Sequence, residues 1–204
     1  MAEARAARMA RERTAYPRWY LKRWHYLPEG YLSRRSIARY ERGVRWLYNA
    51  GREEQVREAV VEALRRDGRS RIVEFGCGPG FLLTDAARAL QPEALVGVDL
   101  SPFALEAAAA RAGAGATLVH ADARHTELDT GRYDAVVAMH VYGHVPEVVA
   151  AGLMAEAERL VRDGGGLYVV DHRWHAETAS DGFEVVSTKM LALKSQRLRV
   201  SVRL

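Results

Sequence analysis

A glycine-rich segment carries the strongest chemical signal in the sequence. It reads E-F-G-C-G-P-G over residues 74–80 and continues the short apolar run 71–75, which is rich in β-branched residues. Glycines at such a position let the backbone turn tightly and approach a ligand closely, and the start of a following helix presents free N–H groups to an anion. We therefore expect a nucleotide or nucleoside to bind at this segment.

Histidines form a second candidate group. His140 and His144 follow one apolar run, and His172 and His175 follow the next. Histidine titrates near neutral pH, so a member of this group can act as a general base, and His140, His144 and His172 are the candidate catalytic residues. A structural role is equally open for His144. Four imidazoles are also potential metal ligands, but few other ligands lie near them in the sequence, and we expect no bound metal.

Alternating strand-like and helix-like segments must position these groups. Short apolar runs predict five strands, at 71–75, 94–100, 116–122, 133–140 and 166–171. Periodicity and capping signals predict four helices, at about 54–66, 82–90, 102–112 and 146–161. Strands that alternate with helices form a mostly parallel sheet with helices on both faces, which is an α/β fold. Ligands bind beyond the carboxyl ends of such strands, where the glycine segment and the histidines would meet.

The carboxyl-terminal part departs from this alternation. Residues 172–181 alone separate the fifth strand from the apolar segment 183–193, which barely reaches the length of a helical crossover. Segment 196–204 alternates strictly between apolar and polar residues. We therefore expect the sheet to end in an antiparallel hairpin.

The glycine segment distinguishes between two kinds of nucleotide-binding loop. A dinucleotide-binding loop would have its third glycine at position 81, where this chain has Phe81. The form E-x-G-x-G-x-G resembles instead motif I of the class I S-adenosylmethionine (SAM)-dependent methyltransferases. Segments 120–123, 139–145 and 162–165 also resemble that family in order and spacing. The resemblance covers about residues 54–171 and implies a Rossmann-like domain.

The resemblance implies a set of SAM contacts. Asp99 would accept hydrogen bonds from both ribose hydroxyls, and Asp122 with the amide of Ala123 would hold the adenine edge. Glu74 would orient the methionine end of the cofactor or would simply cap the turn, and Cys77 is expected to fill the loop rather than to act as a nucleophile. The predicted cofactor-binding residues are Glu74, Gly76, Cys77, Gly78, Gly80, Asp99, Leu100, Asp122, Ala123 and Met139.

The first 50 residues differ from the rest of the chain. They hold 12 basic and 4 acidic residues, a net charge of 12 − 4 = +8 against +4 for the whole chain, and nine of the 17 aromatic residues. In the family this segment often folds over the cofactor as a lid, which makes Tyr31, Arg35, Tyr40 and Arg45 candidate pocket residues, with Tyr31, Tyr40 and Tyr142 of the segment after the fourth strand as the predicted substrate contacts. Packing of this arm onto the sheet is equally compatible, contact with an anionic membrane surface is an alternative, and contact with RNA is a weaker one.

Composition sets the remaining bounds. The 204 residues, 49% of them hydrophobic, fit a single domain over 1–204, with an arm or lid at 1–50 and a SAM-binding core at 51–204. The single cysteine excludes an internal disulfide, and the N-terminus lacks the apolar stretch of a secretory signal. These features favour a cytoplasmic protein.

The sequence therefore predicts transfer of a methyl group from SAM to an oxygen or nitrogen atom of a small molecule, with S-adenosylhomocysteine (SAH) as the product. The alternatives are a membrane-surface methyltransferase for a phospholipid or quinone-type acceptor and a non-catalytic SAM-binding scaffold. Gly143 and Asp163 stand where many family members have Glu and Pro, and these departures concern the acceptor rather than the cofactor. A nucleic-acid partner is not expected, and the sequence determines neither the acceptor nor the oligomeric state.

Overall fold

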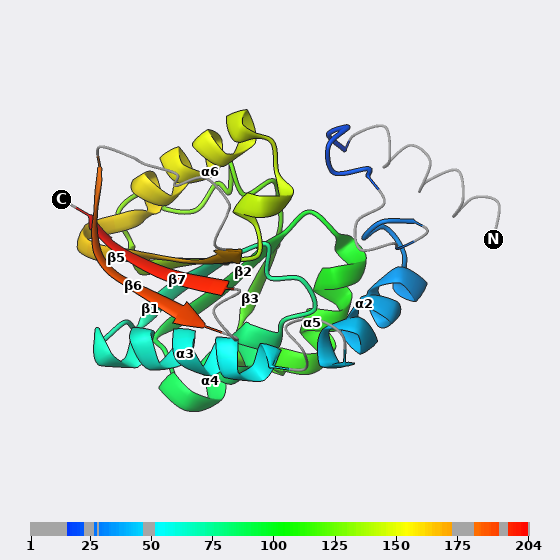
Figure 1. Ribbon diagram of the computed structural model, residues 1–204, viewed down its shortest axis with the longest axis horizontal. Helices are drawn as coiled ribbons and strands as arrows, with labels where there is room; N and C mark the ends of the chain where they lie inside the picture. The colour runs from blue at the N-terminus through cyan, green and yellow to red at the C-terminus, as the bar shows by residue number, and fades with distance from the viewer. Residues whose placement is uncertain are drawn as a thin grey trace.

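The computed structural model describes residues 16–22, 27, 29–46, 52–172, 182–191 and 196–203, with the backbone alone at 44–46, 172, 190 and 196 (Figure 1). Its strands are β1 (Arg71–Phe75), β2 (Ala94–Asp99), β3 (Thr117–His120), β4 (Tyr133–Met139), β5 (Val161–His172), β6 (Phe183–Leu191) and β7 (Gln196–Arg203). The helices are α2 (Arg34–Trp46), α3 (Glu53–Arg66), α4 (Phe81–Leu90), α5 (Pro102–Ala112) and α6 (Glu147–Leu160), with short 3-10 helices η3 (Gly113–Gly115) and η4 (Tyr142–His144). None of these described helices is long and apolar enough to cross a membrane.

The strands form one sheet in the order β3-β2-β1-β4-β5-β7-β6. The first five strands in this order are mutually parallel, and β7 is antiparallel to both of its neighbours. The predicted mostly parallel α/β sheet with a terminal antiparallel hairpin is therefore confirmed.

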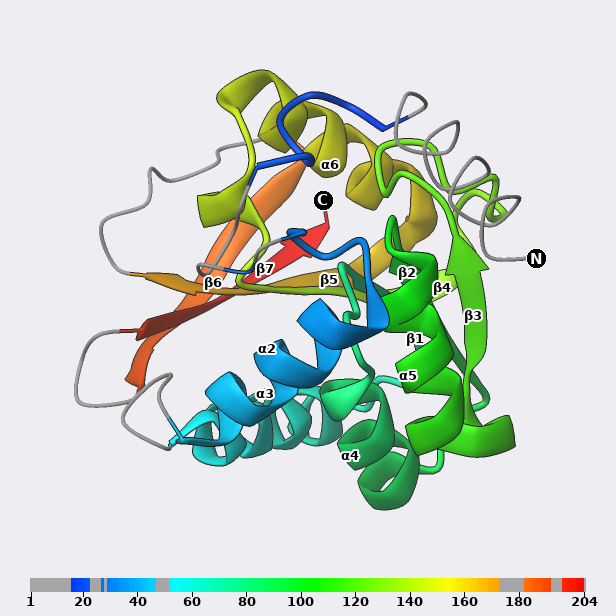
Figure 2. The same cartoon turned by 90° about the vertical axis from the view of Figure 1, so that its right-hand side faces the viewer.

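Two apolar layers hold the sheet between its helices. Alternate side chains of a strand point to opposite faces, so Ile72 of β1 packs with the cluster that contains Leu64 of α3 and Leu83 of α4. The neighbouring Phe75 packs with the cluster that contains Leu160 of α6. Figure 2 shows this arrangement, with α6 above the sheet and α3, α4 and α5 below it. Complete burial of each such side chain contributes about 1.5–3 kcal/mol to folding.

The terminal hairpin completes the sheet in a way that the sequence pattern did not predict. Strand β7 lies between β5 and β6. This insertion buries Leu198 and Val200 in the core beside α3 and α4, whereas Val185 and Val186 of the edge strand β6 remain exposed. The predicted short connection between the fifth and sixth strands falls largely on residues 173–181, which lie outside the described part of the chain.

The segment between β3 and β4 is held without a helix. The carboxylate of Glu156 in α6 accepts hydrogen bonds from the backbone N–H and the hydroxyl of Thr126, at 2.9 and 2.6 Å. Arg159 of the same helix donates to the carbonyl oxygen of Leu128 at 2.7 Å. These contacts fix residues 121–132 against α6 and position the segment immediately after β3.

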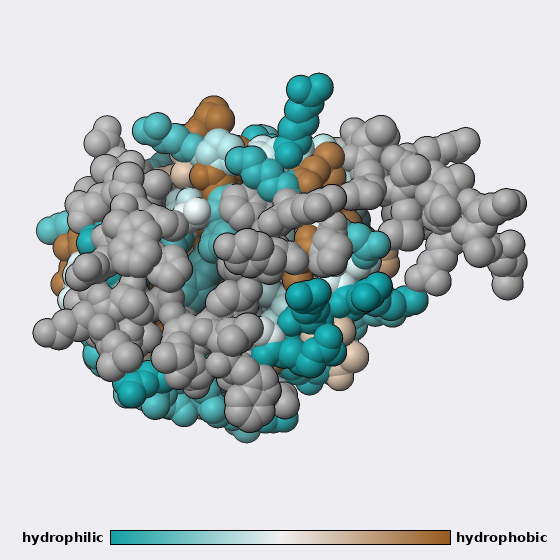
Figure 3. All heavy atoms as spheres, turned by 45° about the vertical axis from the view of Figure 1, so that its right-hand side comes forward, coloured by the Kyte–Doolittle hydropathy of each residue, from teal (hydrophilic) through white to brown (hydrophobic). Residues whose placement is uncertain are grey.

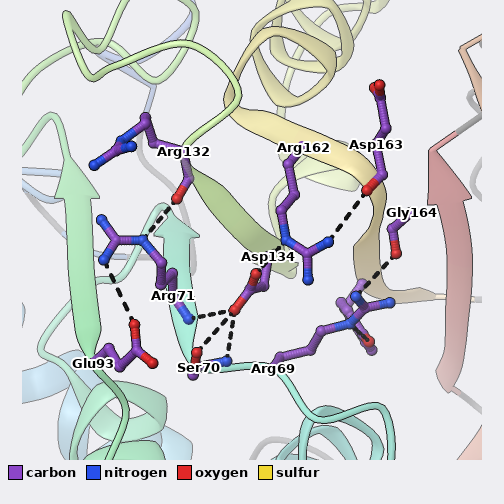
Figure 4. Close-up of polar contacts among 10 residues, drawn as sticks. Arg69, Ser70, Arg71, Glu93, Arg132, Asp134, Arg162, Asp163 and Gly164 are labelled. Carbon is purple, nitrogen blue, oxygen red and sulfur yellow. Dashed lines mark hydrogen bonds and ion pairs between the residues drawn. The ribbon is translucent and has the colours of Figure 1, made fainter.

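At the amino ends of the parallel strands, the buried Asp134 carboxylate of β4 binds residues at the starts of β1 and β5 (Figure 4). Asp134 accepts hydrogen bonds at 2.9 Å from the backbone N–H groups of Ser70 and Arg71, and Arg162 contacts it at 2.6 Å. Burial alone would raise the pKa of Asp134, but the hydrogen bonds from Arg162, Ser70 and Arg71 lower it to about 2. The amino ends of the strands lie opposite their carboxyl ends, where the candidate site forms.

Replacement of this carboxylate should make stability depend less on pH. The pKa of Asp134 falls from an ordinary 3.8 to about 2 in the folded protein, so the carboxylate contributes about 2 kcal/mol of stability at pH 7. The contribution is complete above the unfolded-state pKa and is lost as the pH falls through the folded-state value. Denaturant unfolding should therefore show Asp134→Asn about 2 kcal/mol less stable than wild type at pH 7, with the difference shrinking towards pH 2.

Asp163→Asn is the matched control, because its side chain is 89% exposed at the same end of the strands. It should change stability by less than about 0.5 kcal/mol at every pH. A loss in Asp134→Asn that stayed the same from pH 7 to pH 2 would contradict the assigned ionisation.

Candidate active site

The glycine segment forms a tight loop between β1 and α4. Gly76, Gly78 and Gly80 all have left-handed backbone conformations, with φ values of 64°, 53° and 76°. A Cβ on Gly76 would lie 2.8 Å from a methyl group of Val141, and one on Gly80 would lie 2.9 Å from Cβ of Ala108. Side chains at these two positions would therefore be strained in conformation and in space.

Asp99 ends β2 beside this loop. One carboxylate oxygen accepts a hydrogen bond from the N–H of Gly78 at 2.8 Å, and the other accepts one from Ser101 at 2.7 Å. Burial raises the pKa of Asp99, although these two hydrogen bonds oppose the shift. The arrangement fixes the carboxylate and leaves each of its oxygens further capacity to accept hydrogen bonds.

A cavity of about 140 Å³ opens at the carboxyl ends of the parallel strands. It brings together many of the predicted site residues. Those that line it are Tyr31, Tyr40, Gly76, Gly78, Asp99, Leu100, Asp122, Ala123, Met139, His140 and His144.

The arm covers this cavity and is anchored to α5. Arg34 contacts Glu106 at 2.6 Å, and Glu41 contacts Arg111 at 2.8 Å. Nearer the cavity, the hydroxyl of Ser101 donates to the carbonyl oxygen of Tyr31 at 2.5 Å. The backbone N–H of Ser101 donates to Asp99, which also accepts from Gly78. The arm and the glycine loop are therefore both attached to the Asp99 and Ser101 pair.

Aromatic rings of the arm stack over the cavity. The Tyr20 ring lies 5.7 Å from Trp19 in an edge-to-face arrangement and 6.1 Å from Tyr31, and Tyr31 meets Tyr40 edge-to-face at 5.8 Å. Burial, together with the nearby Asp99 carboxylate, raises the pKa of the Tyr20 phenol well above its ordinary value. The arm thus covers the cavity with neutral aromatic groups.

Another wall of the cavity comes from the segment after β4 and from α6. Asp171 of β5 accepts a hydrogen bond from the backbone N–H of Gly143 at 2.7 Å, which ties η4 to the sheet. His140 and His144 lie in this wall, beside apolar side chains. The apolar residues of the wall are Val141, Val145, Val149 and Leu153.

Asp122 lies at the far end of the cavity, after β3. It contacts Arg124 at 2.6 Å. Burial opposes ionisation, but hydrogen bonds from Arg124 lower the pKa of Asp122 below its ordinary value. Asp122 is therefore ionised at neutral pH, so both of its carboxylate oxygens are acceptors and neither is a donor.

Three predicted cofactor-binding residues, Glu74, Cys77 and Gly80, do not line the cavity. Gly80 lies behind the loop at the start of α4. The side chain of Glu74 is buried on the α3 and α4 side of the sheet, where burial and the charge of Asp99 raise its pKa. Burial likewise raises the pKa of the Cys77 thiol, with further contributions from these two carboxylates, which suits packing and not nucleophilic attack.

Tyr142 is also placed differently from the prediction. Its side chain is buried in the apolar cluster beside α6 and does not line the cavity. The backbone of η4 turns it inward while its neighbours Val141 and His144 face the site. His172 ends β5, its side chain lies outside the described part of the structure, and so does all of His175.

The structure adds residues that sequence reasoning missed. Trp19 and Tyr20 belong to the aromatic arm that the composition singled out, but nothing in the composition ranked them above the other rings. Val149 and Leu153 lie four residues apart on α6, a spacing that places them on one helix face. The remaining lining residues that were not predicted are Pro79, Val98, Ala104, Ala121, Val141 and Val145.

Comparison with known proteins shows similarity to methyltransferases. Residues 72–165 match a family model described as a methyltransferase domain. The chain is 30% identical over 150 residues to the biotin biosynthesis bifunctional protein of Bordetella avium, covering 71% of this chain and 30% of that protein. It is also 30% identical over 113 residues to an uncharacterised methyltransferase of Mycobacterium bovis, covering 55% of this chain and 56% of that protein. The chain thus spans about a third to a half of the length of these curated relatives.

Solved structures share the fold. The magnesium protoporphyrin IX methyltransferase of Synechocystis with bound SAM has a TM-score of 0.63 at 20% identity, over 85% of this chain and 98% of that one. The N-methyltransferase NodS of Bradyrhizobium japonicum with bound SAH has a TM-score of 0.65 at 16% identity, over 82% and 97%. The fold is that of SAM-dependent methyltransferase domains. Together with the domain match over residues 72–165 and the motif order, it makes this chain similar to the class I SAM-dependent methyltransferases.

The residues of the site fit the family's cofactor. Gly78 lines the cavity, and a Cβ added there would meet no atom within 4 Å, so the loop backbone borders open space. Asp99 has remaining acceptor capacity for two hydroxyl groups. The cavity then continues to Asp122 and Ala123, beyond the end of the neighbouring strand β3.

Removal of the Asp99 carboxylate tests this placement. Asp99→Ala should weaken SAH binding at least tenfold, because the ribose hydroxyls lose their acceptor and the Gly78 loop loses its support. Titration calorimetry measures the affinity, and circular dichroism checks the fold. Asp129→Asn, which changes an exposed carboxylate outside the cavity, should bind SAH as wild type does, and wild-type affinity in Asp99→Ala would disprove the placement.

Proposed function

We propose that this protein transfers the methyl group of SAM to an oxygen or nitrogen atom of a small-molecule acceptor. The observation that carries the proposal is a single cavity in which the predicted cofactor residues and an apolar, aromatic chamber adjoin. In this arrangement Asp99 and Leu100 hold the ribose, and Asp122 and Ala123 hold the adenine. Gly76, Gly78 and Met139 then border the methionine end of SAM.

Methyl transfer asks mainly for alignment and for exclusion of water. The sulfonium of SAM supplies an already activated methyl group, so the chain must hold donor and acceptor in line. The rings of Trp19, Tyr20, Tyr31 and Tyr40 serve this purpose as a roof, and the proposal treats residues 1–50 as the lid of a single domain that spans 1–204. Glu74 acts on the methionine end only through the loop, since its side chain faces α3 and α4.

The lining favours an acceptor that is flat or apolar and carries no strong negative charge. No lysine or arginine of the described residues lines the cavity, whereas Asp99 and Asp122 do. One similar fold is named for a magnesium porphyrin and another for N-methyl transfer, which also supports a non-macromolecular acceptor. The apolar wall of Val141, Val145 and Val149 would contact the acceptor, within reach of the imidazoles of His140 and His144.

On the face drawn in Figure 3, hydrophobic side chains of the described residues occur in small groups among hydrophilic ones. The proposal keeps the cytoplasmic location expected from a single cysteine, which is buried.

Methyl-labelled SAM incubated with the protein and a lysate of its source organism tests the function directly. Label in a low-molecular-weight product, above a control without protein, would support the proposal. Label in extracted lipid would favour the membrane-surface enzyme, and label in macromolecules would favour RNA or protein acceptors. Absence of labelled product in every fraction, despite SAH binding, would favour the non-catalytic scaffold.

A variant of α6 separates the acceptor side from the cofactor side. Val149→Phe places a larger side chain in the apolar wall and should reduce label transfer at least tenfold while SAH affinity changes less than threefold. Val148→Phe is the matched control, because Val148 is the next residue of the helix and is 77% exposed. Equal label transfer by Val149→Phe and wild type would contradict the proposed acceptor wall.

A further inference from the structure

A buried carboxylate outside the predicted site contacts one of the candidate bases. Glu53 is the first residue of α3, and its Oε1 lies 3.2 Å from Nε2 of His140. The exposed fraction is 11% for the Glu53 side chain and 19% for that of His140. Because His140 lines the cavity, the contact joins the start of α3 to the acceptor side of the site.

The backbone of His140 is held in an unusual conformation. Its φ of 56° is left-handed, and its N–H donates to the carbonyl oxygen of Val170 in β5 at 2.7 Å. Gln91 and Glu127 are the other non-glycine residues with positive φ in the described chain, and neither lines the cavity. Such conformations persist where the surroundings enforce them, often at functional sites. The structure therefore fixes this imidazole through both its backbone and its ring.

The requirements of helix α3 do not explain the burial of Glu53. An acidic residue in the first turn stabilises a helix, but Glu54 lies in the same turn and supplies its charge while exposed to water. Burying a second carboxylate costs free energy unless it gains a hydrogen bond. The contact with His140 supplies such a hydrogen bond. Because His140 lines the cavity, this contact also affects a side chain of the site.

We propose that Glu53 is a positioning residue for His140 and that His140, so held, is the general base of methyl transfer. This inference rests on the proposed function. Glu53 accepts a hydrogen bond from Nε2–H, which keeps the proton on Nε2, makes Nδ1 the basic nitrogen of the neutral ring, and stabilises the imidazolium.

The proposed step balances atoms and electrons. The proton of the acceptor's O–H or N–H group goes to Nδ1 of His140. The electron pair left on the acceptor atom forms the bond to the methyl carbon, and the pair of the broken carbon–sulfur bond stays on sulfur. The positive charge of the sulfonium is thereby replaced by that of the imidazolium, beside the Glu53 carboxylate.

Other ionisable groups border His140. His144 lies in the same wall of the cavity, Asp171 of β5 holds the N–H of Gly143, and Tyr31 and Tyr40 lie in the roof. The Glu53 carboxylate lies within hydrogen-bonding distance of the His140 ring, so its removal should have a direct effect on the ring.

Nuclear magnetic resonance of protein with ¹⁵N-labelled histidine rings, saturated with SAH, tests the pair without a known acceptor. The His140 signals are assigned with His140→Gln. In wild type, the neutral ring should carry its proton on Nε2. In Glu53→Leu, which removes the hydrogen-bond acceptor, a larger share of the neutral ring should carry its proton on Nδ1. Glu54→Leu, in the same helical turn, should leave the tautomer unchanged.

Two outcomes would overturn the inference. One is a wild-type neutral ring with its proton on Nδ1, and the other is an unchanged His140 tautomer in folded Glu53→Leu. If Glu53→Leu does not fold, Glu53→Gln replaces it and should also show more of the Nδ1–H form than wild type, because its amide can donate to Nε2. Calorimetry with SAH separates the two proposals, because a wild-type protein that does not bind SAH contradicts the proposed function itself.

Discussion

The two backbone hydrogen bonds to the Asp99 carboxylate are the constraint on which the site depends. One holds Gly78 of the cofactor loop, and the other holds Ser101 at the start of α5. Ser101 in turn caps α5 and binds the carbonyl oxygen of Tyr31. A buried carboxylate is tolerated because these N–H groups replace water, so the cofactor loop, the second strand and the arm are all arranged around one charge.

Much of the fold could be predicted from sequence because buried parallel strands read as apolar runs. The run 71–75 and the Ser101 cap with Pro102 placed β1 and α5 within a residue of their observed bounds. The pairing of β7 with β5 could not be predicted in this way. Strict alternation of apolar and polar residues determines which face of a strand is buried, whereas its neighbours in the sheet depend on tertiary contacts.

The residues of the site likewise fall into those that could be predicted from the sequence and those that depend on tertiary packing. The family resemblance implied the loop glycines, Asp99 and Asp122 as cofactor residues, and each of them lies at the end of a strand or in the segment that follows one. Glu74 was given a role at the cofactor, although it lies two residues after Ile72 and strand alternation therefore turns its side chain to the α3 side. The positions of Tyr20 in the roof and Glu53 beneath the wall depend on how the arm and α3 pack, which no local pattern records.

The residues assigned to SAM and those assigned to the acceptor lie on different elements of the fold. The residues assigned to SAM lie in strand ends and the loop, which the sheet and the Asp99 hydrogen bonds hold rigid. The residues assigned to the acceptor lie in the arm, in η4, in α6 and at the start of α3. A substitution in these outer elements can reshape the chamber or move the base without disturbing Gly78 or Asp99. The same cofactor machinery can therefore serve different acceptors, and the contact between Glu53 and His140 is where an outer helix would act on the chemistry itself.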